Sequence, residues 1–319
     1  MNKRGALFGF LPRGWKNNNP YPELLKCRVR DYMTKDVMTI DRQKSLIQAA
    51  HTMIGAHVSC LVVTEDAKPK GIITERDFIK KLPMEKEPKT EILVDELMTK
   101  KVVSVDSDVD LFEAQRLMKK NGFRKLVVAE KGELAGIITQ TDLCKAVAEL
   151  RGHLPEPPIV QDVMTKSAVS VSSEEGFLKV KSLMSQKGMG SVIVADDGEI
   201  QGMFTEFDIV SEFFMNPNKL KNSCMRELMT SPVVCVTPLF DLEFVNKLMI
   251  QKNFRRLPVM EDGKIVGIIT QTDVARSLYQ HFEKNKDKKY PKKWGPKDPY
   301  YTIIKKGSTI LYNLKQPAK

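Results

Sequence analysis

The dipeptide Met33-Thr34 and the heptapeptide Gly71-Ile-Ile-Thr-Glu-Arg-Asp77 decide the fold, because both recur three more times along the chain. The dipeptide returns as Met98-Thr99, Met164-Thr165 and Met229-Thr230, and the Gly-x-x-Thr-x-x-Asp motif returns at residues 136–142, 202–208 and 267–273. From the first threonine to the second is 40 positions in every copy. This fixed register predicts four copies of one structural block, with length variation confined to the linkers.

Each block has the pattern of three strands and two helices. In the second copy, residues 102–105, 125–129 and 135–139 are short apolar runs typical of strands. Between the first two strands, residues 110–121 place Leu111, Ala114, Leu117 and Met118 at the spacing of one helical face. A second helix is expected after the third strand, over residues 141–150. The predicted order is βαββα, which belongs to the α/β (α+β) fold class.

The length of a block predicts how the blocks associate. A unit of about 55 residues buries too little surface to be more than marginally stable alone, so pairs of blocks are expected. Segments rich in Pro, Gly and Asn separate the blocks and are typical of linkers. We expect six segments: a basic N-terminal extension over 1–28, repeats over 29–82, 94–150, 159–214 and 225–280, and a basic aromatic C-terminal tail over 283–319.

The net charge of +11 is concentrated in the two ends of the chain. Residues 1–30 carry +6 and residues 283–319 carry +8, which leaves −3 for residues 31–282. Lysines of the C-terminal tail alternate with Tyr290, Trp294, Tyr300, Tyr301 and Tyr312. That composition suits RNA or DNA, through charge and base stacking. The alternatives are a solvated tail, or docking of residues 300–304 and 309–314 as strands.

Cysteine and histidine usage narrows the chemistry. Five scattered cysteines without a Cys-x-x-Cys pair predict neither a disulfide framework nor a zinc site, and the four histidines have no ligand spacing. No segment approaches the roughly 20 apolar residues of a membrane span. We expect a cytoplasmic protein with no transmembrane segment and no metal site. An enzyme is not expected, because the chain shows neither a Ser/His/Asp constellation nor a Gly-rich phosphate loop.

The Gly-x-x-Thr-x-x-Asp motif lies where a predicted strand meets a predicted helix. Thr-x-x-Asp has the spacing of a capping box, which stabilises a helix by about 1 kcal/mol and requires no ligand. A helix N-terminus with unpaired N–H groups also favours an anion such as phosphate. A carboxylate there can accept hydrogen bonds from both hydroxyls of a ribose. The residues alone leave both interpretations open.

The two motifs together resemble those of cystathionine-β-synthase (CBS) domains, which work in tandem pairs called Bateman modules. The resemblance covers residues 29–278 and implies two such modules. It also implies that adenine nucleotides lie in clefts between paired repeats, with AMP, ADP and ATP as first candidates and S-adenosylmethionine as a further one. The ribose would be held by the motif aspartates, with the motif threonines beside them: Asp77, Asp142, Asp208 and Asp273, and Thr74, Thr139, Thr205 and Thr270.

Two further features of this family distinguish the repeats from one another. A hydroxyl residue in the first strand is present as Thr39, Ser104 and Ser170, but the fourth repeat has Cys235. Because a thiol is a weak donor, the cleft that uses Cys235 is expected to hold phosphate less well.

Basic residues stand just before the second strand of only two repeats. The phosphate ligands expected there are Arg124, Lys125, Arg255 and Arg256, whereas the other two repeats have Ser59-Cys60 and Gly190-Ser191. The planar guanidinium suits phosphate because it donates two parallel hydrogen bonds. The sequence does not decide whether an arginine serves the aspartate of its own repeat or that of the paired repeat.

The resemblance implies a non-catalytic regulatory protein without a cofactor, which binds an adenine nucleotide and signals energy or metabolite state to an unidentified protein partner. Four repeats on one chain are also the architecture of the gamma subunit of AMP-activated protein kinase, a likeness that implies no kinase partner. The four repeats close into a disc within one chain, or two chains pair as a homodimer. The alternative function is a nucleic-acid-binding protein whose CBS modules sense a ligand and whose basic tails bind RNA or DNA.

Overall fold

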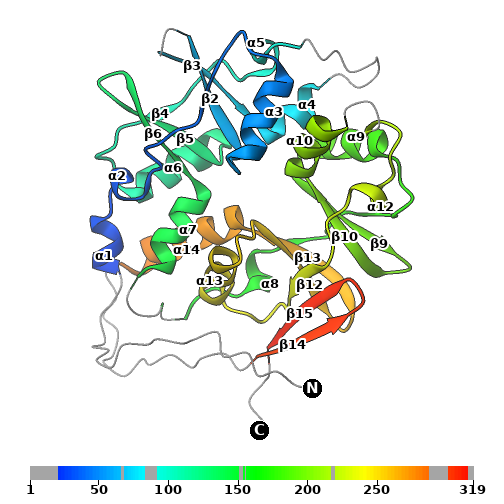
Figure 1. The fold of residues 1–319 in the computed structure, drawn as a ribbon. Helices are drawn as coiled ribbons and strands as arrows, with labels where there is room; N and C mark the ends of the chain where they lie inside the picture. The colour runs from blue at the N-terminus through cyan, green and yellow to red at the C-terminus, as the bar shows by residue number, and fades with distance from the viewer. Residues whose placement is uncertain are drawn as a thin grey trace.

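The computed structural model describes residues 21–65, 68–82, 92–150, 154, 156–216, 220–286 and 301–314. Most of the N-terminal extension and the tail residues Tyr290, Trp294 and Tyr300 lie outside these ranges. The four repeats form a ring in which the first lies beside the second, the second beside the fourth, the fourth beside the third and the third beside the first (Figure 1). One chain therefore closes the ring by itself.

The first two repeats contain the expected strands and helices. Repeat one comprises α2 (Val29–Tyr32), β1 (Thr39–Asp41), α3 (Leu46–Gly55), β2 (Cys60–Glu65), β3 (Lys68–Thr74) and α4 (Glu75–Lys81). Repeat two comprises α5 (Val94–Leu97), β4 (Ser104–Val105), α6 (Leu111–Asn121), β5 (Lys125–Glu130), β6 (Glu133–Thr139) and α7 (Gln140–Ala148). A further helix, α1 (Tyr21–Lys26), precedes them.

The last two repeats follow the same order. Repeat three comprises α8 (Val160–Val163), β7 (Thr165–Lys166), β8 (Ser170–Val171), α9 (Phe177–Lys187), β9 (Ser191–Asp196), β10 (Glu199–Thr205) and α10 (Glu206–Met215). Repeat four comprises α12 (Met225–Leu228), β11 (Val233–Val236), α13 (Leu242–Gln251), β12 (Arg256–Glu261), β13 (Lys264–Thr270) and α14 (Gln271–Asn285). The predicted βαββα order is confirmed in all four.

A four-residue helix that the sequence pattern did not predict precedes every Met-Thr dipeptide. These helices are α2, α5, α8 and α12. Their first residue is fully buried, and its carbonyl accepts a hydrogen bond of 2.8 Å from the methionine amide in each copy. A single turn is too short to show helical periodicity, so it escapes a search for a hydrophobic face. The helix fixes the direction of the Met-Thr dipeptide that follows it, and we call this dipeptide the Met-Thr arm of the repeat.

The Met-Thr arm of each repeat crosses to the repeat it is paired with. Thr34 exchanges two backbone hydrogen bonds with Ile137 of repeat two, and Thr99 exchanges two with Ile72 of repeat one. The same exchange joins repeats three and four, where β7 pairs with β13 and Thr230 pairs with Met203. These reciprocal contacts define two modules, repeats one with two and repeats three with four.

The motif glycines make room for these arms. A β-carbon added at Gly136 would lie 2.8 Å from Met33 Sδ and 2.9 Å from the Thr34 carbonyl oxygen. The other three motif glycines meet the methionine of their paired repeat in the same way. These glycines therefore allow a close backbone approach between paired repeats, which explains why the two motifs recur in one register.

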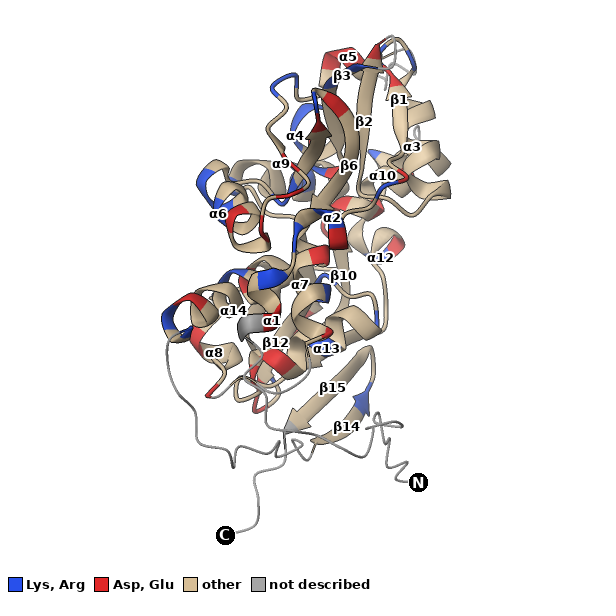
Figure 2. Ribbon diagram, turned by 90° about the vertical axis from the view of Figure 1, so that its left-hand side faces the viewer, with Lys and Arg blue, Asp and Glu red and all other residues tan. Residues whose placement is uncertain are grey.

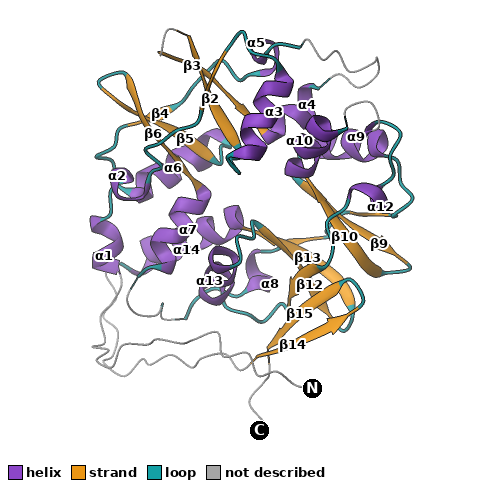
Figure 3. Cartoon of the chain, in the orientation of Figure 1, coloured by secondary structure: helices purple, strands orange, loops and turns teal. Residues whose placement is uncertain are grey.

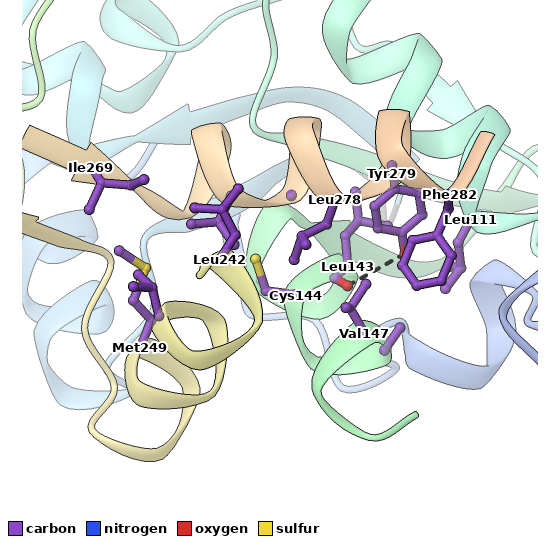
Figure 4. Close-up of a cluster of buried hydrophobic side chains, with 14 of the residues drawn as sticks. Leu111, Leu143, Cys144, Val147, Leu242, Met249, Ile269, Leu278, Tyr279 and Phe282 are labelled. Carbon is purple, nitrogen blue, oxygen red and sulfur yellow. Dashed lines mark hydrogen bonds between the residues drawn. The ribbon is translucent and has the colours of Figure 1, made fainter. Parts of the chain in front are cut away.

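Helices join the modules to each other. Helices α3 and α4 of repeat one pack against α10 of repeat three, and α7 of repeat two packs against α13 and α14 of repeat four (Figure 3). One continuous apolar core runs through repeats two and four, and a second runs through repeats one and three. In the first of these, Tyr279 of α14 packs beside Leu143 of α7 and its hydroxyl donates to the Leu143 carbonyl over 3.4 Å (Figure 4).

The C-terminal tail adds two strands to the sheet of repeat four. Strands β14 (Tyr301–Lys306) and β15 (Thr309–Leu314) form a hairpin, and β15 pairs in parallel with β11. The result is a six-stranded sheet in the order β14-β15-β11-β12-β13-β7. Tyr312 is buried, and its ring lies 5.5 Å from that of Tyr301, which in turn contacts Phe240 and Phe244. Docking as strands is confirmed for this part of the tail.

Within the described ranges, no helix has both the length and the apolar character needed to cross a membrane.

Replacing Gly136 with alanine should destabilise the first module. The added methyl group meets a backbone oxygen that cannot move away without breaking the Thr34 pairing, so we expect a loss of about 1 to 3 kcal/mol, as for other overpacked sites. Urea denaturation followed by circular dichroism measures it. Gly55→Ala is the matched control, because its β-carbon meets nothing within 4 Å. Equal midpoints for the two variants would contradict the close-contact interpretation.

Tyr312→Ala should destabilise the fourth repeat because it removes the buried ring that holds the hairpin on β11. Truncation of a buried aromatic costs about 3 to 5 kcal/mol, and thermal denaturation measures the change. Ile304→Ala is the control on the same hairpin, since Ile304 is 44% exposed. If both variants melt together, the hairpin does not contribute to the stability of the fold.

Candidate functional site

The four Gly-x-x-Thr-x-x-Asp motifs all form capping boxes. In each, the threonine amide and hydroxyl both donate to Oδ2 of the aspartate, at distances between 2.6 and 3.0 Å. The helix that follows begins at the next residue. The motif therefore performs the structural role that the sequence suggested. It uses one carboxylate oxygen for that role.

The second oxygen of the aspartate faces the arm of the paired repeat. Thr99 donates to Asp77 Oδ1 and Thr230 donates to Asp208 Oδ1, both over 3.4 Å. Lys81 lies 2.8 Å from Asp77 Oδ1. Because the cap and the cleft use different oxygens, helix capping and ribose binding are compatible in one residue.

A cavity of about 710 Å³ lies where all four repeats meet. Asp77 and Asp273 both line it, whereas Asp142 and Asp208 are not among its lining residues. Ten Lys and Arg side chains line it against four Asp and Glu side chains. The basic residues are Arg76, Lys80, Lys81, Lys101, Lys119, Arg124, Lys125, Arg255, Arg256 and Arg276, and the acidic residues are Glu75, Asp77, Glu206 and Asp273.

The second basic residue of each predicted pair crosses within its own module. Lys125 of repeat two donates to the Ser59 hydroxyl (2.8 Å) and carbonyl (3.0 Å) of repeat one. Arg256 of repeat four lies over Gly190 of repeat three, where an added β-carbon would be 3.0 Å from its Nη1. A long basic side chain thus needs a small residue opposite it, which explains why each module has one basic copy and one small copy.

The first basic residue of each pair crosses between modules. Arg255 of repeat four donates from both terminal nitrogens to the two carboxylate oxygens of Glu75 in repeat one, over 3.0 and 2.9 Å. Arg124 of repeat two donates to both carboxylate oxygens of Glu206 in repeat three, over 2.9 and 2.8 Å. Arg76 of repeat one also donates to Glu206, over 3.1 Å. The Arg255–Glu75 and Arg124–Glu206 pairs join repeats at opposite positions in the ring, whereas Arg76–Glu206 joins neighbouring repeats.

Burial and neighbouring charges shift the pKa values of this cluster. Burial alone would raise the pKa of Glu206, but Arg124, Arg256 and Arg76 outweigh it and hold the pKa below its ordinary value. Burial lowers the pKa of Arg256 to about 10, although Glu206 opposes this, and the nearby Arg255 and Arg124 add to the lowering. Glu206 is therefore ionised at neutral pH, and Arg256 is charged but crowded by other cations.

Burial also acts on the motif aspartate of repeat three, Asp208. Burial raises its pKa, against hydrogen bonds from Thr205 and the charge of Arg256. The charge of Arg256 thus acts on the aspartate of the paired repeat, in agreement with Lys125, which reaches Ser59 across the first module.

Other predicted residues lie apart from the cavity. Thr39, Ser104 and Ser170 are exposed on their first strands and do not line it. Cys235 is buried, with β15 paired beside it. Three motif threonines, Thr74, Thr139 and Thr270, do line the cavity. Among the described residues, no group of three or more His, Cys, Asp or Glu side chains could hold a metal ion.

The sequence did not lead us to expect Glu75, Glu206 and Arg76 at the candidate site. A signal was present in the motif itself, because the residue after the threonine is Glu in repeats one and three and Gln in repeats two and four. Read one repeat at a time, such a residue is an ordinary first position of a helix, where an acidic side chain is favourable. Its partners come from distant repeats, which only the ring brings together.

Comparisons with known proteins agree with this architecture. The CBS domain matches at residues 29–83, 94–149, 160–214 and 225–280. MJ1225 of Methanocaldococcus jannaschii is 28% identical over 196 residues, which are 58% of this chain and 69% of that protein. MJ1404 of the same organism is 24% identical over 272 residues, 80% of this chain and 62% of that protein.

Two solved structures resemble this fold over most of the chain. The crystal structure of MJ1225, described as a proposed archaeal homologue of the gamma subunit of AMP-activated protein kinase, matches with a TM-score of 0.71 at 21% identity and covers 79% of this chain and 100% of that chain. A protein from Pyrococcus horikoshii matches with a TM-score of 0.54 at 20% identity, with the same coverage of both chains. Since the matched segments make up more than half of the sequence, the protein belongs to the CBS domain family, with four CBS domains arranged as two Bateman modules.

Proposed function

We propose that this chain is a non-catalytic regulatory protein that binds phosphorylated adenine nucleotides, AMP, ADP or ATP, in its central cavity. The observation that carries the proposal is a contrast in charge. Residues 31–282 have a net charge of −3, yet the cavity that they form is lined by ten basic and four acidic side chains. Concentrating like charges in a partly closed space is unfavourable unless an anion joins them.

The proposed ligand position follows from the two aspartates at the cavity. Asp77 and Asp273 would accept hydrogen bonds from the ribose through Oδ1, because Oδ2 is used by the cap. The apolar side chains beside them, Val102 and Val103 on one side and Ala168 and Val169 on the other, would contact the base. The phosphates would then point toward the arginines. A volume of about 710 Å³ is in the range of small-molecule sites.

The same features rank the candidate sites and ligands. S-adenosylmethionine carries a sulfonium cation, which a cavity lined mainly by Lys and Arg would repel, so the phosphorylated nucleotides are preferred. Asp142 and Asp208 remain proposed ribose ligands of weaker sites, because neither lines the cavity.

Signalling would use the contacts between modules. The Arg124–Glu206 and Arg255–Glu75 pairs join the modules at the cavity, so a phosphate that competes for these arginines changes the contacts between modules. Such a ligand shifts the equilibrium to the extent that it binds the two arrangements differently. The description of MJ1225 as a proposed gamma-subunit homologue supports an energy-sensing role. We further propose a cytoplasmic setting, in which the five free thiols stay reduced, and a protein partner of unidentified class.

Contacts of the C-terminal hairpin weaken the alternative that the basic tail binds nucleic acid. Tyr301 and Tyr312, two of the aromatic residues expected to stack on bases, instead pack together against repeat four. Lys306 of the same hairpin pairs with Glu199 over 2.7 Å. Basic and acidic residues also alternate over the described elements (Figure 2).

Asp77→Asn and Asp273→Asn should weaken nucleotide binding while leaving the fold intact. The amide oxygen of asparagine can still accept from the threonine amide, but the residue no longer offers a second carboxylate oxygen to the ribose. Loss of hydrogen bonds to a charged group, worth about 1.5 to 3 kcal/mol, should raise Kd about 10- to 100-fold. Calorimetric titration with AMP, ADP, ATP and S-adenosylmethionine measures the effect.

Asp142→Asn is the matched control, since it alters an identical capping box whose aspartate does not line the cavity. We expect it to change AMP binding less than either of the other two variants. Failure of the wild-type protein to bind any adenine nucleotide would contradict the proposed function. Stronger binding of S-adenosylmethionine than of AMP would contradict the phosphate interpretation of the cavity.

A further inference from the structure

One position of the repeat carries a charge in two copies and none in the other two. The residue after the motif threonine is Glu75 in repeat one and Glu206 in repeat three, but Gln140 in repeat two and Gln271 in repeat four. All four are first residues of their helices, all line the cavity, and none is more than 5% exposed. At this position the copies thus differ by a single ionisable group.

The two glutamates accept hydrogen bonds from arginines that line the cavity. Glu75 accepts two parallel hydrogen bonds from Arg255, an arrangement that a phosphate would also use. Glu206 accepts from Arg124 through both oxygens and from Arg76 through one. Each carboxylate therefore takes hydrogen-bond donors that would otherwise be available to an anionic ligand.

The cluster remains short of negative charge. Four arginines, Arg76, Arg124, Arg255 and Arg256, stand against two glutamates, which leaves a net charge of +2. Arg256 has Arg255 and Arg124 as cationic neighbours, and of the two carboxylates that oppose them Glu206 acts on it more strongly than Glu75. A phosphate monoester carries about two negative charges at neutral pH. One such group would neutralise the cluster without displacing either glutamate.

We propose that Glu75 and Glu206 determine how many phosphate charges the cavity accepts, favouring one phosphate monoester over a polyphosphate chain. The inference rests on the proposed function and deepens it, since it assigns AMP rather than ATP as the preferred ligand. A triphosphate brings more charge than the arginine cluster lacks, so within this cluster it competes with the carboxylates for Arg124 and Arg255. That competition also breaks the ion pairs between modules.

The test replaces each glutamate with the residue found in the other repeats. Glu75→Gln, Glu206→Gln and the double variant keep the size of the side chain and remove one or two negative charges. Each removed carboxylate should raise the ratio of ATP affinity to AMP affinity about tenfold, which corresponds to about 1.4 kcal/mol. The dependence of ATP binding on salt should become steeper as the cluster becomes more positive. Glu113→Gln is the control, because Glu113 pairs with Arg116 at the surface, away from the cavity.

The ionised state of Glu206 has a separate test. Its pKa is lower in the folded protein than its ordinary value, so its pairing stabilises the fold above the unfolded-state pKa of about 4.3 and this contribution is lost as the pH falls through the folded-state pKa. Between neutral pH and pH 3, the melting temperature of Glu206→Gln should fall less than that of the wild-type protein. Identical acid profiles would overturn the inference, because Glu206 would then not act as a charged partner of the arginines.

Inorganic pyrophosphate and orthophosphate separate this inference from the proposed function. They probe the arginine cluster without an adenine or ribose site, so they remain informative if nucleotides fail to bind. A rise in the preference for pyrophosphate in the glutamine variants supports the inference whatever the nucleotides do. If the double variant does not fold, Glu75→Gln alone carries the measurement. Unchanged ratios for both the nucleotide pair and the phosphate pair, in a folded variant, would overturn it.

Discussion

A methionine-threonine arm that crosses to the paired repeat is the contact on which the rest of the structure depends. Each arm leaves a single helical turn, forms two backbone hydrogen bonds with the last strand of its partner and lies against the partner's motif glycine. A repeat without its partner would leave that edge of the strand unpaired. Because the arms cross in both directions, neither repeat of a module is complete alone. The two motifs share one register along the chain because they contact each other in space.

The modules in turn depend on one another. The apolar faces of their helices enter two cores, one shared by repeats two and four and one shared by repeats one and three. Strand pairing therefore joins the two repeats within each module, and helix packing joins each repeat to a neighbouring repeat of the other module. Such a closed arrangement leaves the diagonal pairs of repeats to meet only at the centre. The polar residues that meet there, Glu75 with Arg255 and Glu206 with Arg124, come from repeats that share no sheet.

This arrangement explains which features could be predicted from the sequence. The strands, the two main helices and the caps depend on residues within one repeat. The hairpin at Tyr301 to Leu314 was one of several alternatives, because alternating apolar residues do not show which edge a strand will join. The role of Glu75 and Glu206 could not be predicted, because it depends on diagonal contacts that follow from ring closure. The exposure of Thr39, Ser104 and Ser170 likewise depends on how the strands sit relative to the cavity.

The central cluster connects stability with binding. Bringing Arg76, Arg124, Arg255 and Arg256 together opposes folding, and the buried carboxylates of Glu75 and Glu206 offset only part of that repulsion. The apolar cores and the crossed arms must supply the remainder, since they fix the positions of the helices that carry these residues. An anion that enters the cavity adds attraction only in the folded state, so it must stabilise the ring as it binds. The same arginines that hold the two modules together are thus the groups through which a phosphate can alter the contact between them.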